Sequence, residues 1–328
     1  MAKQKIVVLD PLSDALSDAV RALLEGDRFE WIELDEGKDI SGSLRDADFL
    51  ISNRSDIDRS TLEAAKDVRL VIKYQSGAGD VDWQALDEMD VPLVEIPCLA
   101  LYTVAEFAVM SILALAKEYA TAIIETREQV WLPDLQPKPT TQSEYAYNWV
   151  ELERFDTVYG KTVGIIGLGT IGQSVAKLLQ PFGVEVLYTD PRRLRSIEEQ
   201  RLGVTYVELD ELLSRSDFVT LHIRLTEDTE KFMDERKFEM MKPTAYLVNT
   251  SRGRVVDEKA LFEAVSEGKI AGAALDVFRV EPLPSDSSLW ELEDVIITPH
   301  VAGTPVGRAV KAESESIVRK LTEYSDCL

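Results

Sequence analysis

The sequence predicts an α/β protein made of two parallel-sheet domains. The chain has 328 residues, which is more than a single hydrophobic core usually spans. Short apolar runs alternate with helical patterns in both halves of the chain, and such alternation is typical of parallel sheets covered by helices. A glycine-rich turn opens the second half, between an apolar run and a helical pattern. Together these features indicate two sheets in tandem.

Short apolar runs in the first hundred residues have the length of buried strands. These predicted strands span 6–9, 31–34, 49–52, 70–74 and 93–96, with helical patterns at 13–25 and 60–65. In the second half, strands are predicted at 162–166, 184–188, 218–222, 245–249, 272–275 and 295–298. A final helix is predicted at 305–324.

Between the two sheets lies a long apolar stretch at 103–122, rich in alanine, leucine and methionine. A helix that is apolar on most faces should be buried, either in a core or between domains or subunits. Residues 131–150 differ, because prolines and threonines are followed by Tyr145, Tyr147 and Trp149. Such a segment is typical of an irregular arm, and its aromatic residues suggest a contact with another subunit.

Composition limits the class of protein. The formal net charge of −23 argues against nucleic acid or an anionic membrane as a partner, since both repel such a surface. An ordinary solvated surface is favoured over an adaptation to high salt. We find no run of about 18 apolar residues, so we expect no membrane span. The N-terminus lacks the features of a signal peptide. Cys98 and Cys327 form neither a disulfide framework nor a metal cluster, so we expect a cytoplasmic protein without a metal.

The glycine turn has the spacing of a dinucleotide site. A predicted strand leads directly into Gly167, Gly169 and Gly172, and a helical run follows. The first glycine permits a tight turn, the second admits a pyrophosphate close to the backbone, and the third lets the helix pack on the strand. Free amides at the helix N-terminus would bind the phosphates.

Asp190 stands at the end of the next predicted strand. A carboxylate there can bind both ribose hydroxyls of an adenosine and would repel a 2′-phosphate, so it favours NAD over NADP. Arg192 and Arg193 leave NADP open, because arginines at this point can accommodate the phosphate.

Later segments carry residues suited to hydride transfer at a carbonyl, each just after a predicted strand. His300 lies at the sheet edge where open α/β sheets hold ligands, and histidine exchanges a proton near neutral pH. Arg252 could bind a carboxylate through two hydrogen bonds. Asp276 and Glu281 are carboxylates, and a carboxylate beside a histidine fixes its tautomer. The other histidine, His222, lies inside a predicted strand, where a satisfied structural role is favoured.

In this order and spacing, the motifs resemble those of the D-isomer-specific 2-hydroxyacid dehydrogenase family over essentially the whole chain. The resemblance is carried by Gly167-Leu168-Gly169-Thr170-Ile171-Gly172, Asn249-Thr250-Ser251-Arg252-Gly253, Leu275-Asp276-Val277-Phe278 with Glu281-Pro282-Leu283, and Thr298-Pro299-His300. It implies a catalytic triad of Arg252, Glu281 and His300. It also implies that Asp276 faces the nicotinamide, with further cofactor contacts from Thr103, Thr170, Ile171, Ile223, Thr250, Ser251 and Gly303.

The resemblance implies a substrate site as well. The amides of Ser76 and Gly77 would hold the substrate carboxylate, although Gln75 stands where the family usually has glycine. Arg252 and His300 would also contact the substrate. Arg54 matches a position where some relatives use arginine on an anionic substrate, and together with Lys73 it could bind a phosphate.

The implied fold is two Rossmann-like parallel-sheet domains, with the substrate domain split around the dinucleotide-binding domain. Residues 1–102 would form a flavodoxin-like substrate domain, 103–298 an NAD-binding Rossmann domain, and 299–328 a segment that returns to the substrate domain. The implied activity is hydride transfer between NAD and a small 2-oxo or 2-hydroxy acid of the glyoxylate, hydroxypyruvate or lactate type. A phosphoglycerate dehydrogenase and a cofactor-sensing binding protein similar to corepressors stay open. The family also implies a homodimer through the long helix and the arm.

Overall fold

The computed structural model describes residues 3–24, 28–34, 41–74, 81–130, 132–303 and 307–326. The chain divides into two compact units. Unit 1 comprises Met1–Tyr102 and Thr304–Leu328, and unit 2 comprises Thr103–Gly303. Unit 2 therefore extends beyond the predicted end at Thr298, because the amides of Val301 and Ala302 donate hydrogen bonds to Asp276 within that unit.

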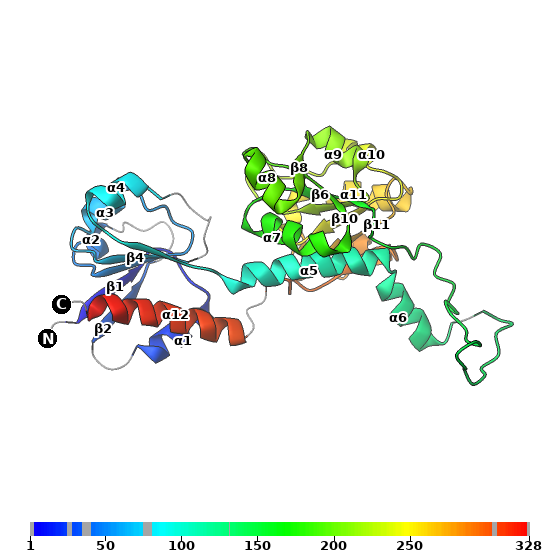
Figure 1. Ribbon diagram of the computed structural model, residues 1–328, viewed down its shortest axis with the longest axis horizontal. Coiled ribbons are helices and arrows are strands. Elements are labelled where there is room, and N and C mark those ends of the chain that lie inside the picture. The colour runs from blue at the N-terminus through cyan, green and yellow to red at the C-terminus, as the bar shows by residue number, and fades with distance from the viewer. Residues whose placement is uncertain are drawn as a thin grey trace. The chain divides into compact units, whose positions relative to one another are not determined.

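Unit 1 is built on a five-stranded parallel sheet in the order β2-β1-β3-β4-β5. The strands are β1 (Gln4–Val8), β2 (Phe29–Glu33), β3 (Phe49–Ser52), β4 (Leu70–Tyr74) and β5 (Leu93–Ile96). Figure 1 shows α1 and α12 together below this sheet, with α3 and α4 above it. The helices of unit 1 are α1 (Asp14–Leu23), α2 (Ser41–Leu44), α3 (Arg59–Ala64), α4 (Trp83–Glu88) and α12 (Gly307–Ser325). Ile6 and Val8 pack toward α1 and α12 while Val7 packs toward α2, α3 and α4, since successive strand residues face opposite sides of a sheet.

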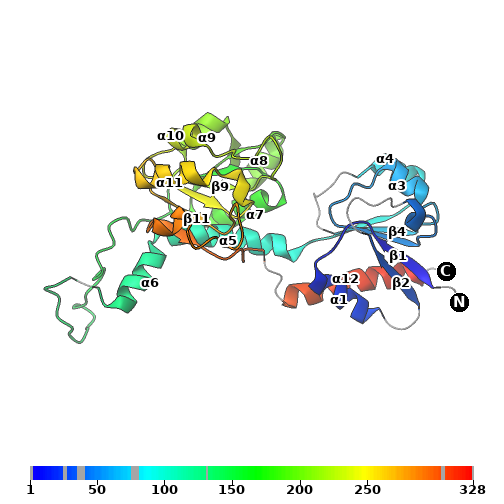
Figure 2. The same cartoon turned by 180° about the vertical axis from the view of Figure 1, so that it is seen from behind.

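Unit 2 is built on a seven-stranded parallel sheet in the order β12-β11-β10-β9-β6-β7-β8. The strands are β6 (Thr162–Ile166), β7 (Glu185–Thr189), β8 (Val204–Tyr206), β9 (Phe218–Leu221), β10 (Tyr246–Asn249), β11 (Gly272–Leu275) and β12 (Val295–Ile297). One core packs this sheet against α9 (Leu209–Arg215), α10 (Glu235–Met240) and α11 (Glu258–Ser266), which Figure 2 shows from behind. The other core packs it against α5 (Leu99–Ala116), α7 (Thr170–Leu179) and α8 (Ser196–Leu202). Short 3₁₀ helices are η1 (Gln180–Phe182), η2 (Gly253–Val255) and η3 (Ser288–Glu291).

The predicted strands are present, with bounds shifted by one or two residues at most. β9 ends at Leu221, so His222 lies just outside the strand rather than inside it. β8 has no counterpart in the sequence prediction, because a run of three residues carries too little pattern to recognise.

The long apolar stretch forms two helices rather than one. Glu118 has a left-handed φ of 44°, which ends α5 and starts α6 (Tyr119–Glu128) in a new direction. Within the single chain one side of α5 is buried and α6 has no buried residue, so burial of the remaining faces between subunits stays a prediction. Within the described ranges, α5 is the one helix long and apolar enough to cross a membrane, a property that core helices share. Residues 132–159 contain no helix or strand, as the sequence predicts for the arm.

Candidate active site

The glycine turn after β6 requires glycine for two different reasons. Gly167 has a φ of +93°, and a Cβ there would lie 2.6 Å from the carbonyl oxygen of His222. At Gly172 a Cβ would lie 2.2 Å from the carbonyl oxygen of Gly167, so glycine lets α7 approach the turn. Gly169 instead has open space where its Cβ would be, and it precedes an α7 N-terminus that no side chain caps. The turn therefore leaves amides and room for an anionic group.

The strand order of unit 2 reverses beside this turn. β6 lies between β7 and β9, so the chain diverges to opposite sides at the carboxyl end of β6, the position where open α/β sheets bind ligands. His222 and Thr250 follow the neighbouring strands β9 and β10 at the same register. His222 Nδ1 and Thr250 Oγ1 are both buried without a hydrogen-bond partner among the described residues. Buried polar atoms are rarely left unpaired, so both fit a site that a polar ligand completes.

His222 is only half satisfied, contrary to the sequence prediction. Its Nε2 lies 3.0 Å from Thr220 Oγ1, but its Nδ1 has no protein partner. Burial lowers the pKa of His222 to about 4, because desolvation penalises the charged ring. The ring is therefore neutral at physiological pH and takes no part in proton exchange there.

Asp190 lies against the glycine turn. Its two oxygens accept hydrogen bonds at 2.8 Å from the amides of Leu168 and Arg192. The Arg193 guanidinium lies 4.8 Å from the centre of the Tyr206 ring, which holds it to the protein's own surface. The carboxylate is thus placed at the end of β7, where the sequence puts the ribose contact.

The two predicted acid–base residues are in direct contact. His300 Nδ1 lies 2.6 Å from Glu281 Oε2, and Glu281 Oε1 accepts from the amide of Phe278 at 2.9 Å. Burial would raise the pKa of Glu281, but the hydrogen bonds from His300 and Phe278 and the charge of Arg252 lower it below its usual 4.5. Glu281 is therefore an ionised partner for the histidine at neutral pH.

Asp276 holds the loop that carries His300. Its carboxylate is 1% exposed and accepts hydrogen bonds from Thr298 Oγ1 at 2.7 Å, from the Val301 amide at 2.9 Å and from the Ala302 amide at 2.8 Å. Between them His300 has a left-handed φ of 54°, a conformation that the surrounding bonds must enforce. The carboxylate therefore lies beneath the loop, and its implied contact with the nicotinamide stays a prediction.

Arg252 is brought to the same place by a turn that Asn249 organises. Asn249 Oδ1 accepts from the amide and hydroxyl of Ser251, and its Nδ2 donates to the Arg252 carbonyl at 3.0 Å. A Cβ on Gly253 would lie 1.9 Å from the Phe278 carbonyl carbon, so the glycine lets the Arg252 turn pack against the Glu281 loop. The three predicted catalytic residues therefore belong to interlocked segments of unit 2.

The comparisons with known proteins agree with this geometry. The family model described as D-isomer specific 2-hydroxyacid dehydrogenase, NAD binding domain, matches residues 109–302. The glyoxylate reductase of Korarchaeum cryptofilum (strain OPF8) is 40% identical over 282 residues, covering 83% of this chain and 81% of that protein. The chain belongs to the D-isomer-specific 2-hydroxyacid dehydrogenase family. It is an NAD-dependent 2-hydroxyacid oxidoreductase.

Two further proteins match nearly the whole chain. The D-3-phosphoglycerate dehydrogenase of Methanocaldococcus jannaschii is 33% identical over 319 residues, covering 97% of this chain and 56% of that protein. The crystal structure of the PH0520 protein from Pyrococcus horikoshii OT3 has a TM-score of 0.69 and 29% identity, covering 98% of this chain and 92% of that one. Because this match covers both sheets, both domains have the Rossmann-like architecture.

The residues of this dehydrogenase fit a bound NAD. Thr170 and Ile171 begin α7 beside the open space at Gly169, and Ile223 packs beside Gly167. A Cβ on Gly303 would lie 3.2 Å from Val104, so Gly303 reaches the helix that also carries Thr103. The remaining predicted contacts of this surface, Thr250 and Ser251, lie in the Asn249 turn.

The predicted substrate contacts outside unit 2 are only partly described. Ser76 and Gly77, with Gln75, lie outside the described residues. Arg54 is exposed at the end of β3. The interpretation that Lys73 binds a phosphate is wrong, because Lys73 is 1% exposed and its Nζ donates to Ser52 Oγ at 2.8 Å and to the Ser55 carbonyl at 2.7 Å.

The sequence analysis did not identify a role for Asp10, which lies in the same region as Arg54. It is buried, and its carboxylate accepts hydrogen bonds from the amides of Asn53, Arg54 and Ser55. It therefore fixes the turn that presents the Arg54 side chain. The sequence feature that could have identified Asp10 is its position directly after a predicted buried strand, because a carboxylate there has either a structural or a binding role.

The Glu281→Gln variant tests the contact with His300. We expect kcat/KM for reduction to fall by about 10- to 100-fold, the value of a hydrogen bond to a charged group. Steady-state kinetics at pH 7 measure the fall, with the exposed Glu291→Gln as the matched control. An unchanged kcat/KM would contradict the assignment.

Proposed function

We propose that this dehydrogenase reduces a small 2-oxo acid of the glyoxylate type with NADH. The observation that carries the proposal is the His300–Glu281 contact of 2.6 Å, next to the turn that holds Arg252. A relative 40% identical to the chain is named glyoxylate reductase, which supports glyoxylate as the first substrate to test.

The side chains divide the work of this reaction. NADH, when bound, supplies the hydride that adds to C2 of the substrate. Glu281 holds the Nδ1–H of His300, which leaves Nε2 to donate a proton to the developing alkoxide oxygen. Arg252 binds the substrate carboxylate and stabilises negative charge on the adjacent carbonyl oxygen. Addition of one hydride and one proton converts the 2-oxo acid to a 2-hydroxy acid, which for glyoxylate is the achiral glycolate.

A phosphoglycerate dehydrogenase is the second candidate. The relative with that name matches 97% of the chain, and Arg54 offers an exposed guanidinium on the Asp10 turn. The burial of Lys73 removes the second cation that a phosphate would use in the described part of unit 1. This balance favours the smaller, unphosphorylated substrate.

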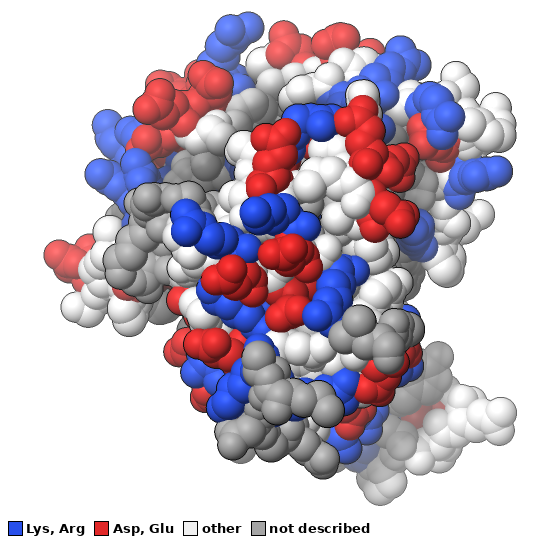
Figure 3. All heavy atoms as spheres, turned by 90° about the vertical axis from the view of Figure 1, so that its left-hand side faces the viewer, with Lys and Arg blue, Asp and Glu red and all other residues white. Residues whose placement is uncertain are grey.

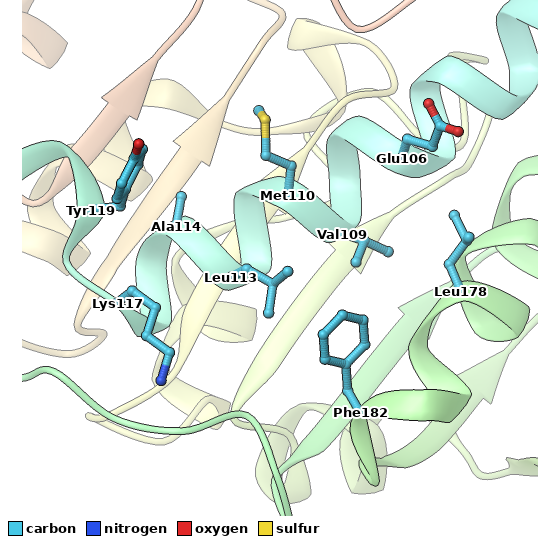
Figure 4. A pocket seen from close by; sticks show the side chains of 9 residues that line it. All are labelled: Glu106, Val109, Met110, Leu113, Ala114, Lys117, Tyr119, Leu178 and Phe182. Atoms are coloured by element: carbon cyan, nitrogen blue, oxygen red, sulfur yellow. The ribbon is translucent and has the colours of Figure 1, made fainter.

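We also propose that the protein forms a homodimer through α5 and the arm. An apolar groove of about 440 Å³ lies along α5, and Figure 4 shows Val109 and Leu113 on the side of the helix that faces Phe182. Met110 is 50% exposed beside this groove, and Tyr147 of the arm is 81% exposed. Burial of such apolar side chains between two subunits would be favourable.

The surface charge supports a cytoplasmic protein that binds neither nucleic acid nor membrane. The net charge is −23. On the face drawn in Figure 3, carboxylates are interspersed with lysine and arginine, so that face offers no continuous cationic patch for a polyanion.

A panel of 2-oxo acids tests the proposed function. Oxidation of NADH is followed at 340 nm with glyoxylate, hydroxypyruvate, pyruvate, phenylpyruvate, 2-oxoglutarate and 3-phosphohydroxypyruvate. We expect the highest kcat/KM with glyoxylate, and His300→Ala should lower kcat by about 10² to 10⁴ while NADH binding persists. A preference for 3-phosphohydroxypyruvate would favour the second candidate. Tight NADH binding without turnover of any acid would contradict the proposal, and a preference for NADPH would contradict the role of Asp190.

The Met110→Lys variant tests the proposed dimer. A charged side chain in an apolar interface costs several kcal/mol unless it is paired. We therefore expect sedimentation analysis at micromolar concentration to show a dimer for the natural chain and a monomer for the variant. Ile197→Lys, on an exposed position of α8, is the control. A monomeric natural chain would contradict the proposal.

A further inference from the structure

Helix α5 begins without a capping residue of its own. Cys98 precedes its first residue, Leu99, and follows Pro97, whereas serine, threonine, aspartate and asparagine are the residues that normally cap a helix N-terminus. The cap comes instead from the C-terminal helix. Glu313 of α12 accepts a hydrogen bond from the Leu99 amide at 2.5 Å, from a position 214 residues away in sequence.

The second oxygen of Glu313 holds the end of β4. Tyr74 Oη donates to Glu313 Oε2 at 2.9 Å and lies 3.2 Å from Cys98 Sγ. The three side chains are 5 to 7% exposed. Burial, together with Cys98 and Glu313, raises the pKa of Tyr74, so the hydroxyl remains a donor to the carboxylate. One carboxylate thus joins β4, α5 and α12.

Burying the carboxylate of Glu313 to join these elements costs free energy. Within the described ranges, no cationic side chain forms an ion pair with Glu313, and the Tyr74 hydroxyl and Leu99 amide that donate to it are neutral groups. A buried carboxylate in that setting costs free energy that apolar packing would avoid. Stability alone therefore gives little reason for a carboxylate here, whereas two directed hydrogen bonds fix the relative position of three chain segments.

Each of these three segments adjoins a part of the chain with a predicted role in catalysis or substrate binding. The chain passes from unit 1 to unit 2 along α5, after Tyr102, and returns after Gly303 to enter α12. Tyr74 is the last residue of β4, and the sequence prediction places the substrate carboxylate at Ser76 and Gly77. We infer that Glu313 is a positioning residue for substrate binding, which sets the end of β4 against the first turn of α5.

The inference rests on the proposed function, and the full chain tests it through Glu313→Gln and Tyr74→Phe. We expect Glu313→Gln to raise the KM for glyoxylate about tenfold, with kcat within about twofold and NADH affinity unchanged, because the loss is confined to substrate positioning. Tyr74→Phe should change KM in the same direction. The double variant should be no worse than Glu313→Gln alone, since both remove one shared contact. Glu315→Gln, exposed on the same helix, is the matched control.

Amide hydrogen exchange at Leu99 provides a readout that needs no turnover. Exchange at this amide should accelerate in Glu313→Gln relative to Glu315→Gln. A Glu313→Gln protein with the KM and exchange of the control would overturn the inference. So would a parallel fall in kcat, NADH affinity and folded fraction, which would mark a purely structural residue, or additive effects in the double variant. If the natural chain itself turns over no 2-oxo acid, the proposed function fails, and Leu99 exchange still decides whether Glu313 holds α5.

Discussion

The buried carboxylate of Asp276 holds the loop that carries the acid–base histidine, and the arrangement of the active site depends on it. Three hydrogen bonds reach it from Thr298, Val301 and Ala302. They force the residue between, His300, into a left-handed conformation that an unconstrained histidine would avoid. Glu281 Oε2 then lies 2.6 Å from His300 Nδ1. The position of the proton donor is therefore set by Asp276 through the backbone and by Glu281 through the ring.

The sheet topology explains why these residues meet. Arg252, Asp276 and His300 follow β10, β11 and β12, which are adjacent and parallel, so their carboxyl ends share one edge. The glycine turn follows β6 at the same edge, where the strand order reverses. Close approach is achieved by removing side chains, as at Gly253, where the backbone of Phe278 occupies the space of a Cβ. Cofactor site and catalytic residues are therefore consequences of one sheet.

The sequence predicted most of the fold, because buried parallel strands leave continuous apolar runs and glycine turns have a fixed spacing. It failed at 103–122, where composition hides a change of direction at Glu118. It placed the catalytic residues by resemblance, but it did not show that Asp276 holds the His300 loop, since a carboxylate after a strand has the same pattern whether it faces a ligand or a loop. It could not foresee Asp10 or Glu313 either, because their partners are tens to hundreds of residues away in the chain.

The Asp276→Asn variant, assayed for both NADH affinity and turnover, tests the central claim most directly. An amide cannot accept all the hydrogen bonds of the loop, and a displacement of about 1 Å in a catalytic group costs about a hundredfold in rate. The account predicts a fall in kcat of that order with an unchanged dissociation constant for NADH. Weakened NADH binding with near-normal kcat would contradict it, and would favour the predicted contact of Asp276 with the nicotinamide.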